Sequence, residues 1–151
     1  MTRDIARILV AIDFSVPSAA AWATARGLAR ALRAELLLAH VFAEPPLFSE
    51  GPFAGPRVRE VYAAGRAWVD KTLEEWAAAA RAEGLTVRVQ VREGAPYREI
   101  VALAGEERVD LVVVGTHGRG GLERALLGSV ADRVIRLAPC PVLSVRELTG
   151  A

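Results

Sequence analysis

Short apolar runs alternate with longer stretches of helical periodicity along the whole chain, and this alternation restricts the fold more than any other feature. The runs have the length of strands and lie at residues Arg7–Phe14, Glu35–Phe42, Leu85–Arg92, Val109–Val114 and Val142–Arg146. The order βαβαβαβαβ predicts an α/β fold, in which a parallel sheet carries helices on both faces. The third run alternates apolar and polar residues, which predicts a strand with one exposed face at a sheet edge.

The helical segments show where each helix starts and which side faces the core. Ser15 is the expected N-cap of the first helix, and Pro17 is tolerated in its first turn. The core-facing positions expected for this helix are Ala21, Ala25, Leu28 and Leu32. A long helix is expected at Val58–Ala82, ending at Glu83-Gly84, with a buried face of Val58, Tyr62, Val69, Leu73, Trp76 and Ala80. A short helix starts at Gly94-Ala95-Pro96.

The fourth strand passes directly into a glycine-rich segment and then into the last helix, expected at Ser129–Leu137. Gly115 follows the apolar run, Gly118 comes three residues later, and Gly128-Ser129 follows after nine further residues. Glycines let backbone N–H groups approach an anion, and a helix N-terminus supplies unpaired donors with a partial positive charge. The segment therefore predicts an anion-binding site at the start of the last helix.

Two interpretations without a ligand remain open for this segment. The glycines can serve only the turn between strand and helix. Ser129, with Asp132 three residues further on, resembles a capping box, so Ser129 can cap its own helix. Capping and anion binding are compatible, because backbone donors of the first turn remain available.

Composition excludes several classes of protein. The chain has 151 residues, of which 52% are hydrophobic, and this suits one domain with a full core. A net charge of +1 without a basic run does not indicate a surface that binds nucleic acid. No apolar run approaches the length of a membrane-spanning helix. Lys71 is the single lysine and no G-x-x-x-x-G-K-[ST] motif is present, which excludes a P-loop NTPase. The single Cys140 cannot form an internal disulfide, which fits the reducing cytoplasm.

Two positions at the ends of the first strands are candidates for ligand contacts. Asp13 stands where the first strand ends, and its carboxylate can accept hydrogen bonds from an adenine amino group or a ribose, or lie near a metal. The alternative is that Asp13 ends the strand or caps the next helix. Val41 can form an apolar wall for a flat base. His40, inside the apolar run, is interpreted as a satisfied core residue.

The segment Ala43–Pro56 is rich in proline and glycine and is expected to be a loop. Phe48 and Phe53 within it can cover a ligand or dock on a neighbouring molecule. The sequence of this segment does not distinguish between a lid, a binding loop and a mobile connection.

The glycine spacing G-x2-G-x9-G-[ST] resembles the nucleotide-binding signature of the universal stress protein family. The similarity covers nearly the whole chain, including V-A-I-D in the first strand, H-V in the second and P-C-P-V-L-S-V at the end. The resemblance implies a single domain over residues 1–151 with a Rossmann-like, adenine nucleotide α hydrolase-like fold and strand order 3-2-1-4-5. It also implies ATP binding, because family members with the full signature resemble ATP binders.

The resemblance also implies roles for particular residues. The adenine and ribose would be lined by Ala11, Asp13 and Val41, and Gly115 would lie against the ribose. The phosphates would be approached by Gly118, Arg119, Gly128, Ser129 and Val130. Apart from the resemblance, His117 lies inside the glycine segment, where it can act as a base or phosphate contact or simply be a polar loop residue. Mg²⁺ would bridge phosphate oxygens and need few protein ligands. Family members commonly form homodimers through the last strand, which here would use Val142, Leu143 and Val145.

Three functions are compatible with these features. The first is an ATP-binding module, in the cytoplasm, whose bound state regulates a stress response or a partner. The second is a slow ATPase or self-phosphorylating protein, with His117 and Ser129 as the only attractive groups. The third is a nucleotide-free interaction protein in which the glycines serve the turn alone.

Overall fold

A computed structural model of the chain describes residues 3–43, 55–117 and 127–147. Strands and helices alternate throughout these residues, as the apolar runs predict. In chain order the elements are β1 (Arg7–Ala11), α1 (Val16–Leu32), β2 (Glu35–Phe42), α2 (Pro56–Ala82), β3 (Val87–Glu93), α3 (Pro96–Glu106), β4 (Leu111–Gly115), α4 (Ser129–Leu137) and β5 (Val142–Val145).

The strands form one parallel sheet in the order β3-β2-β1-β4-β5, which confirms the expected topology and places β3 at an edge. The central strand β1 pairs with β2 on one side, where Val10 lies opposite Leu38, and with β4 on the other, where Val10 lies opposite Val113. Strands β2 and β3 therefore lie on one side of β1, and β4 and β5 lie on the other, so the strand order reverses between β1 and β4. Ligands of open α/β sheets bind outside the carboxyl ends of strands at such a point.

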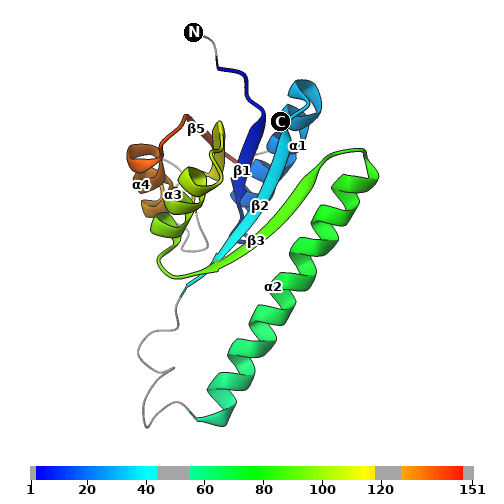
Figure 1. The fold of residues 1–151 in the computed structure, drawn as a ribbon. Helices are drawn as coiled ribbons and strands as arrows, with labels where there is room; N and C mark the ends of the chain where they lie inside the picture. Colours follow the sequence, from blue (N-terminus) through cyan, green and yellow to red (C-terminus); the bar gives the residue numbers. More distant parts are fainter. Residues whose placement is uncertain (1–2, 44–54, 118–126, 148–151) are drawn as a thin grey trace.

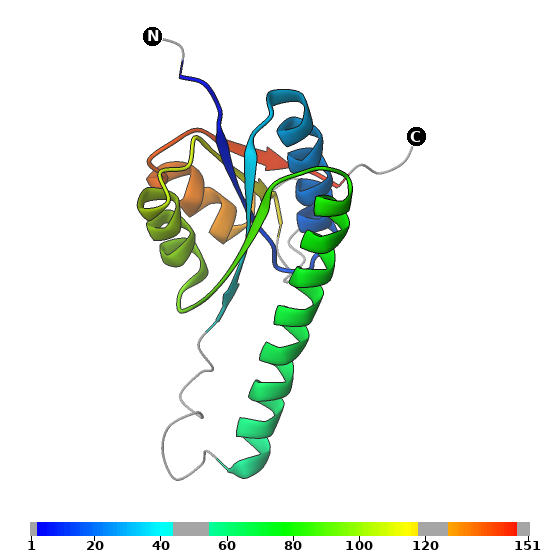
Figure 2. The same cartoon turned by 45° about the vertical axis from the view of Figure 1, so that its right-hand side comes forward.

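Helices cover both faces of the sheet, as expected (Figures 1 and 2). Alternate residues of each strand point to opposite faces, so Ile8 and Val10 of β1 pack in one core cluster with α1 and α2. Leu9, between them, packs in a second cluster with α3 and α4. Both faces of β1 are thus buried, which explains its continuous apolar sequence. Within the described residues, no helix has the length and apolar character needed to cross a membrane.

Two residues expected in the core are exposed. Leu32 of α1 is 46% exposed, and Ala29 is the last buried residue of that helix. Val58 of α2 is 39% exposed, and the buried positions of α2 begin at Val69. The reason is visible in Figure 1, where the amino-terminal half of α2 extends past the carboxyl ends of the strands and has no sheet beneath it.

Candidate functional site

The candidate residues that the structure describes lie at the carboxyl edge of the sheet, where β1, β2 and β4 end and α1 and α4 begin. Hydrogen bonds connect the segments that follow these strands. The Gly128 N–H donates to the Thr116 carbonyl oxygen at 2.7 Å, and the Ser15 hydroxyl donates to the His117 carbonyl oxygen at 3.4 Å. The structure thus brings together the end of β1, the end of β4 and the start of α4.

Asp13 lies two residues beyond β1 and shapes the turn into α1. Its Oδ1 accepts a hydrogen bond from the Ser15 N–H at 2.9 Å. Ser15 is the N-cap of α1, as expected, and its hydroxyl oxygen accepts from the Ser18 N–H at 3.3 Å. A carboxylate has about four acceptor positions, so one hydrogen bond leaves Asp13 with capacity for a ligand. The structural role and the ligand role are therefore compatible.

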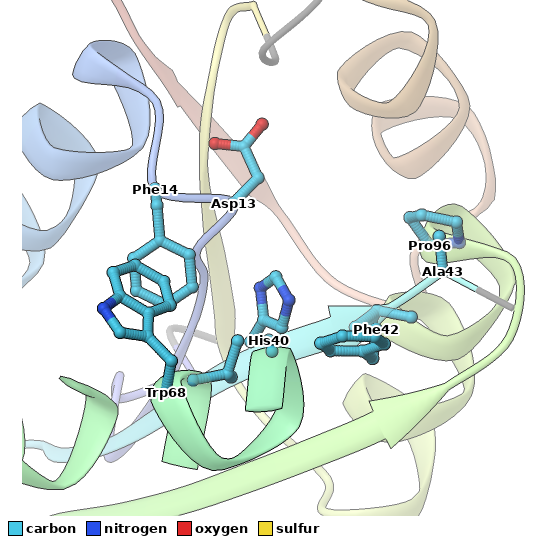
Figure 3. A pocket seen from close by; sticks show the side chains of 10 residues that line it. Asp13, Phe14, His40, Phe42, Ala43, Trp68 and Pro96 are labelled. Carbon is cyan, nitrogen blue, oxygen red and sulfur yellow. The ribbon is translucent and has the colours of Figure 1, made fainter. Parts of the chain in front are cut away.

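A pocket of about 590 Å³ opens beside Asp13. It lies between the ends of β1 and β2, the middle of α2 and the start of α3 (Figure 3). Its lining consists of Asp13, Phe14, His40, Val41, Phe42, Ala43, Gly65, Trp68, Val69 and Pro96. Asp13 and Val41, both expected in a base or ribose site, share this pocket. Its volume is within the range of small-molecule sites, which is roughly 300–1,000 Å³.

Gly115, the last residue of β4, packs against the amino end of α1. A Cβ placed on Gly115 would lie 2.8 Å from both the Pro17 carbonyl carbon and the Ser18 backbone nitrogen. Backbone atoms at that distance leave no room for a side chain. Helix packing alone therefore requires glycine at this position, as the interpretation without a ligand expects.

The amino end of α4 differs from the expected capping box. Gly128 is the N-cap, with φ −61° and ψ 153°, and Ser129 is the first helical residue. Ser129 therefore does not cap its own helix, and that expectation is wrong. Asp132 instead accepts a hydrogen bond from the Arg136 guanidinium one turn later, at 3.2 Å. Since Gly128 has no side chain to cap the helix, backbone N–H groups of the first turn are suited to an anion.

Two arginines add positive charge beside α4. The Arg133 guanidinium, on the second turn of α4, lies 4.7 Å from the centre of the Tyr97 ring of α3. The Arg98 guanidinium donates a hydrogen bond to the Tyr97 hydroxyl oxygen at 2.9 Å. This hydrogen bond holds the pKa of the Tyr97 phenol below its usual range. Both guanidiniums thus lie on the Tyr97 side chain, while the first turn of α4 carries the acidic Asp132.

The remaining candidates have different surroundings. The His117 Nδ1 lies 2.9 Å from the Thr116 hydroxyl, and its buried Nε2 has no hydrogen-bond partner among the described residues. Ala11 and Val130 are partly buried and pack, like Val41, against the core cluster of α3 and α4. Gly118 and Arg119, with Phe48 and Phe53 of the loop, lie outside the described residues. Their expected contacts stay predictions.

The aromatic part of the pocket was not anticipated from the sequence. Phe14, Phe42 and Trp68 line it, and His40 joins them through ring contacts with Phe14 at 5.1 Å and Phe42 at 6.0 Å. His40 is only partly buried and lies 2.6 Å, through Nδ1, from the Ile12 carbonyl oxygen. The ring of His40 has a hydrogen-bond partner, as expected, but it also lines the pocket. A signal for Trp68 existed, because this tryptophan falls outside the apolar stripe of its helix.

These elements define a doubly wound, parallel α/β protein with a candidate anion site at the carboxyl edge of its sheet, where α4 begins. Residues 5–146 match the sequence model of the universal stress protein family. The chain is 36% identical to universal stress protein YxiE of Bacillus subtilis strain 168, over 93% of this chain and 98% of that protein. It is 48% identical to universal stress protein MJ0531 of Methanocaldococcus jannaschii over a shorter match, which covers 52% of this chain and 42% of that protein. The chain belongs to the universal stress protein family.

Solved structures share the fold. The hypothetical protein MJ0577, of Methanocaldococcus jannaschii, superposes with a TM-score of 0.86 at 27% identity, over 98% of this chain and all of that chain. A universal stress protein crystallised in complex with cAMP superposes with a TM-score of 0.66 at 28% identity, over 96% of this chain and 99% of that chain.

Proposed function

We propose that this universal stress protein binds ATP at the carboxyl edge of its sheet and acts as a nucleotide-dependent regulatory module in a stress response. The observation that carries the proposal is that two features suited to a nucleotide lie at the carboxyl edge of the sheet. One is the pocket that contains Asp13 and Val41, and the other is the amino end of α4, where Gly128 leaves the helix without a side-chain cap. The cAMP complex of a related protein supports an adenine nucleotide as the ligand.

In this proposal the base and ribose contact Ala11, Asp13 and Val41, and Gly115 lies near the ribose. The triphosphate extends toward α4, where backbone N–H groups of Ser129 and Val130 point outward from the first turn. The further phosphate contacts are Gly128, His117, Gly118 and Arg119. Mg²⁺ neutralises the phosphate oxygens and takes most of its ligands from phosphate and water.

We infer binding and not catalysis as the role of the site. Backbone donors and packed glycines hold a ligand without reacting with it. His117 is the candidate base of the site, and its Nδ1 is engaged by the Thr116 hydroxyl at 2.9 Å. The single cysteine supports a reducing, cytoplasmic setting. Titration of ATP into nucleotide-stripped protein tests the proposal, and failure to bind at millimolar ATP would remove it.

We propose in addition that β5 pairs with the same strand of a second copy. β5 is the last strand of the sheet, and its Leu143 is 36% exposed. An edge strand presents unpaired backbone groups, which pairing across a two-fold axis would satisfy.

Replacing Leu143 with glutamate should convert the dimer to monomer, because two carboxylates would face each other across the strand pair. Sedimentation velocity measures the change in mass. The control is Val61→Glu, which adds the same charge at an exposed position of α2, and which should leave the mass unchanged. A Leu143→Glu protein that sediments as the dimer would show that β5 is not the interface.

A further inference from the structure

Trp68 has an unusual environment for a large apolar side chain. It is 51% exposed, whereas Trp22 is 6% exposed and Trp76 packs against the core cluster of α1 and α2. Trp68 follows the half of α2 that extends past the sheet, and it lines the pocket that also contains Asp13 and Val41. An indole in this position gains little from burial in the free protein, so its exposed surface is available to a ligand.

The neighbouring Phe14 holds Trp68 in place. Its φ of +64° is rare for a bulky residue and strains the backbone. This conformation puts the Phe14 ring 4.8 Å from the Trp68 ring, at an interplanar angle of 64°, and 5.8 Å from the Trp76 ring. Figure 3 shows the two rings together, while the Asp13 carboxylate points away from them. Edge-to-face contacts of this kind fix ring orientation.

The residue one turn before Trp68 is a glycine that packs against the Phe42 ring. Gly65 also lines the pocket and contributes no side chain, and a Cβ there would already touch the Phe42 ring at 3.4 Å. The pocket is therefore lined by the aromatic residues Phe14, Phe42 and Trp68, and also by Asp13, whose carboxylate points away from the Phe14 and Trp68 rings. A flat ring with polar edges suits this combination of aromatic walls and a carboxylate.

We propose that Trp68 is a binding residue for the base of the nucleotide, which stacks on the exposed indole while the phosphates reach α4. The inference rests on the proposed function, because it assigns a further residue to the same site. Stacking of a base on an aromatic side chain contributes about 1–3 kcal/mol by alanine substitution, so Trp68→Ala should weaken ATP binding roughly 10- to 100-fold.

The test is calorimetric titration of ATP with Mg²⁺ into the wild type and three variants. Trp68→Phe keeps a flat ring and should recover most of the affinity that Trp68→Ala loses. Val61→Ala shortens another exposed apolar residue of α2, outside the pocket lining, and should bind like the wild type. Inorganic tripolyphosphate, which lacks a base, should bind Trp68→Ala as well as it binds the wild type. Circular dichroism verifies that each variant is folded.

Each outcome has a distinct meaning. A loss of ATP affinity confined to Trp68→Ala, with tripolyphosphate unaffected, supports the stacking role. Equal ATP affinity of the wild type and Trp68→Ala would overturn it and leave the proposed function intact. Equal weakening of ATP and tripolyphosphate would also overturn it, because Trp68 would then act on the shape of the whole site. A wild type that does not bind ATP would overturn both proposals together.

Discussion

ATP binding should be abolished when Gly128 is replaced by arginine, with a loss of affinity of at least roughly 100-fold, the scale of two strong hydrogen bonds. The long side chain would start from the N-cap of α4 and occupy the space in front of the first-turn N–H groups. The backbone permits the substitution, because φ −61° and ψ 153° at Gly128 are open to any residue, and circular dichroism verifies the fold because Gly128 is buried. The hydrogen bond from residue 128 N–H to the Thr116 carbonyl is also retained. Calorimetric titration of ATP measures the loss.

The matched control for this substitution is Leu127→Arg. Leu127 is the preceding residue and is exposed, so its replacement adds the same charge to the same turn without obstructing the amino end of α4. We expect this variant to bind ATP with nearly wild-type affinity. If the folded Gly128→Arg protein binds ATP as the wild type does, then the start of α4 does not hold the phosphates.

Replacing Gly115 with alanine should destabilise the protein by about 2 kcal/mol and lower its melting temperature by roughly 4–8 °C. The new methyl group would meet backbone atoms of Pro17 and Ser18 at 2.8 Å, and helix backbone cannot move aside as a flexible side chain can. The start of α1 would have to shift away from β4. Thermal and urea unfolding, followed by circular dichroism, measure the effect.

Gly27→Ala serves as the control for the same chemical change. Gly27 lies in the middle of α1, and a Cβ there would meet nothing within 4 Å. Alanine at this position should stabilise the helix by about 0.5–1 kcal/mol, because glycine loses more conformational freedom on folding. The two variants should therefore shift the melting temperature in opposite directions. An unchanged melting temperature for Gly115→Ala would show that α1 and β4 are not closely packed at this point.

The sheet follows from the sequence because residues buried on both faces leave a continuous apolar run. Such runs predicted parallel strands and helices on both faces, and the family resemblance supplied the strand order. The extent of each helix face was less predictable. Periodicity shows which side of α2 is apolar, but it does not show where the sheet beneath that side ends. For this reason Val58 was expected in the core although it is exposed.

The candidate site was predictable where a residue's position depends on its place along a strand. Asp13 and Val41 were expected at strand ends, and the structure places both in one pocket. The positive φ of Phe14 has no signature in the sequence, because phenylalanine rarely adopts it. The place of Phe14 in the pocket was missed for that reason, whereas Trp68 could have been found, because it falls outside the apolar stripe of α2. The proposed capping role of Ser129 was wrong, because Gly128 is the N-cap of α4, one residue earlier.

The most direct test of the account is calorimetric titration of ATP with Mg²⁺ into protein stripped of nucleotide. The account predicts saturable binding with micromolar affinity and weaker binding of AMP, because AMP lacks the phosphates that reach α4. GTP should also bind more weakly, since guanine carries an oxygen where adenine presents an amino group to Asp13. The absence of heat and of any thermal shift at millimolar ATP would contradict the account, and the glycine segment would then serve only the turn into α4.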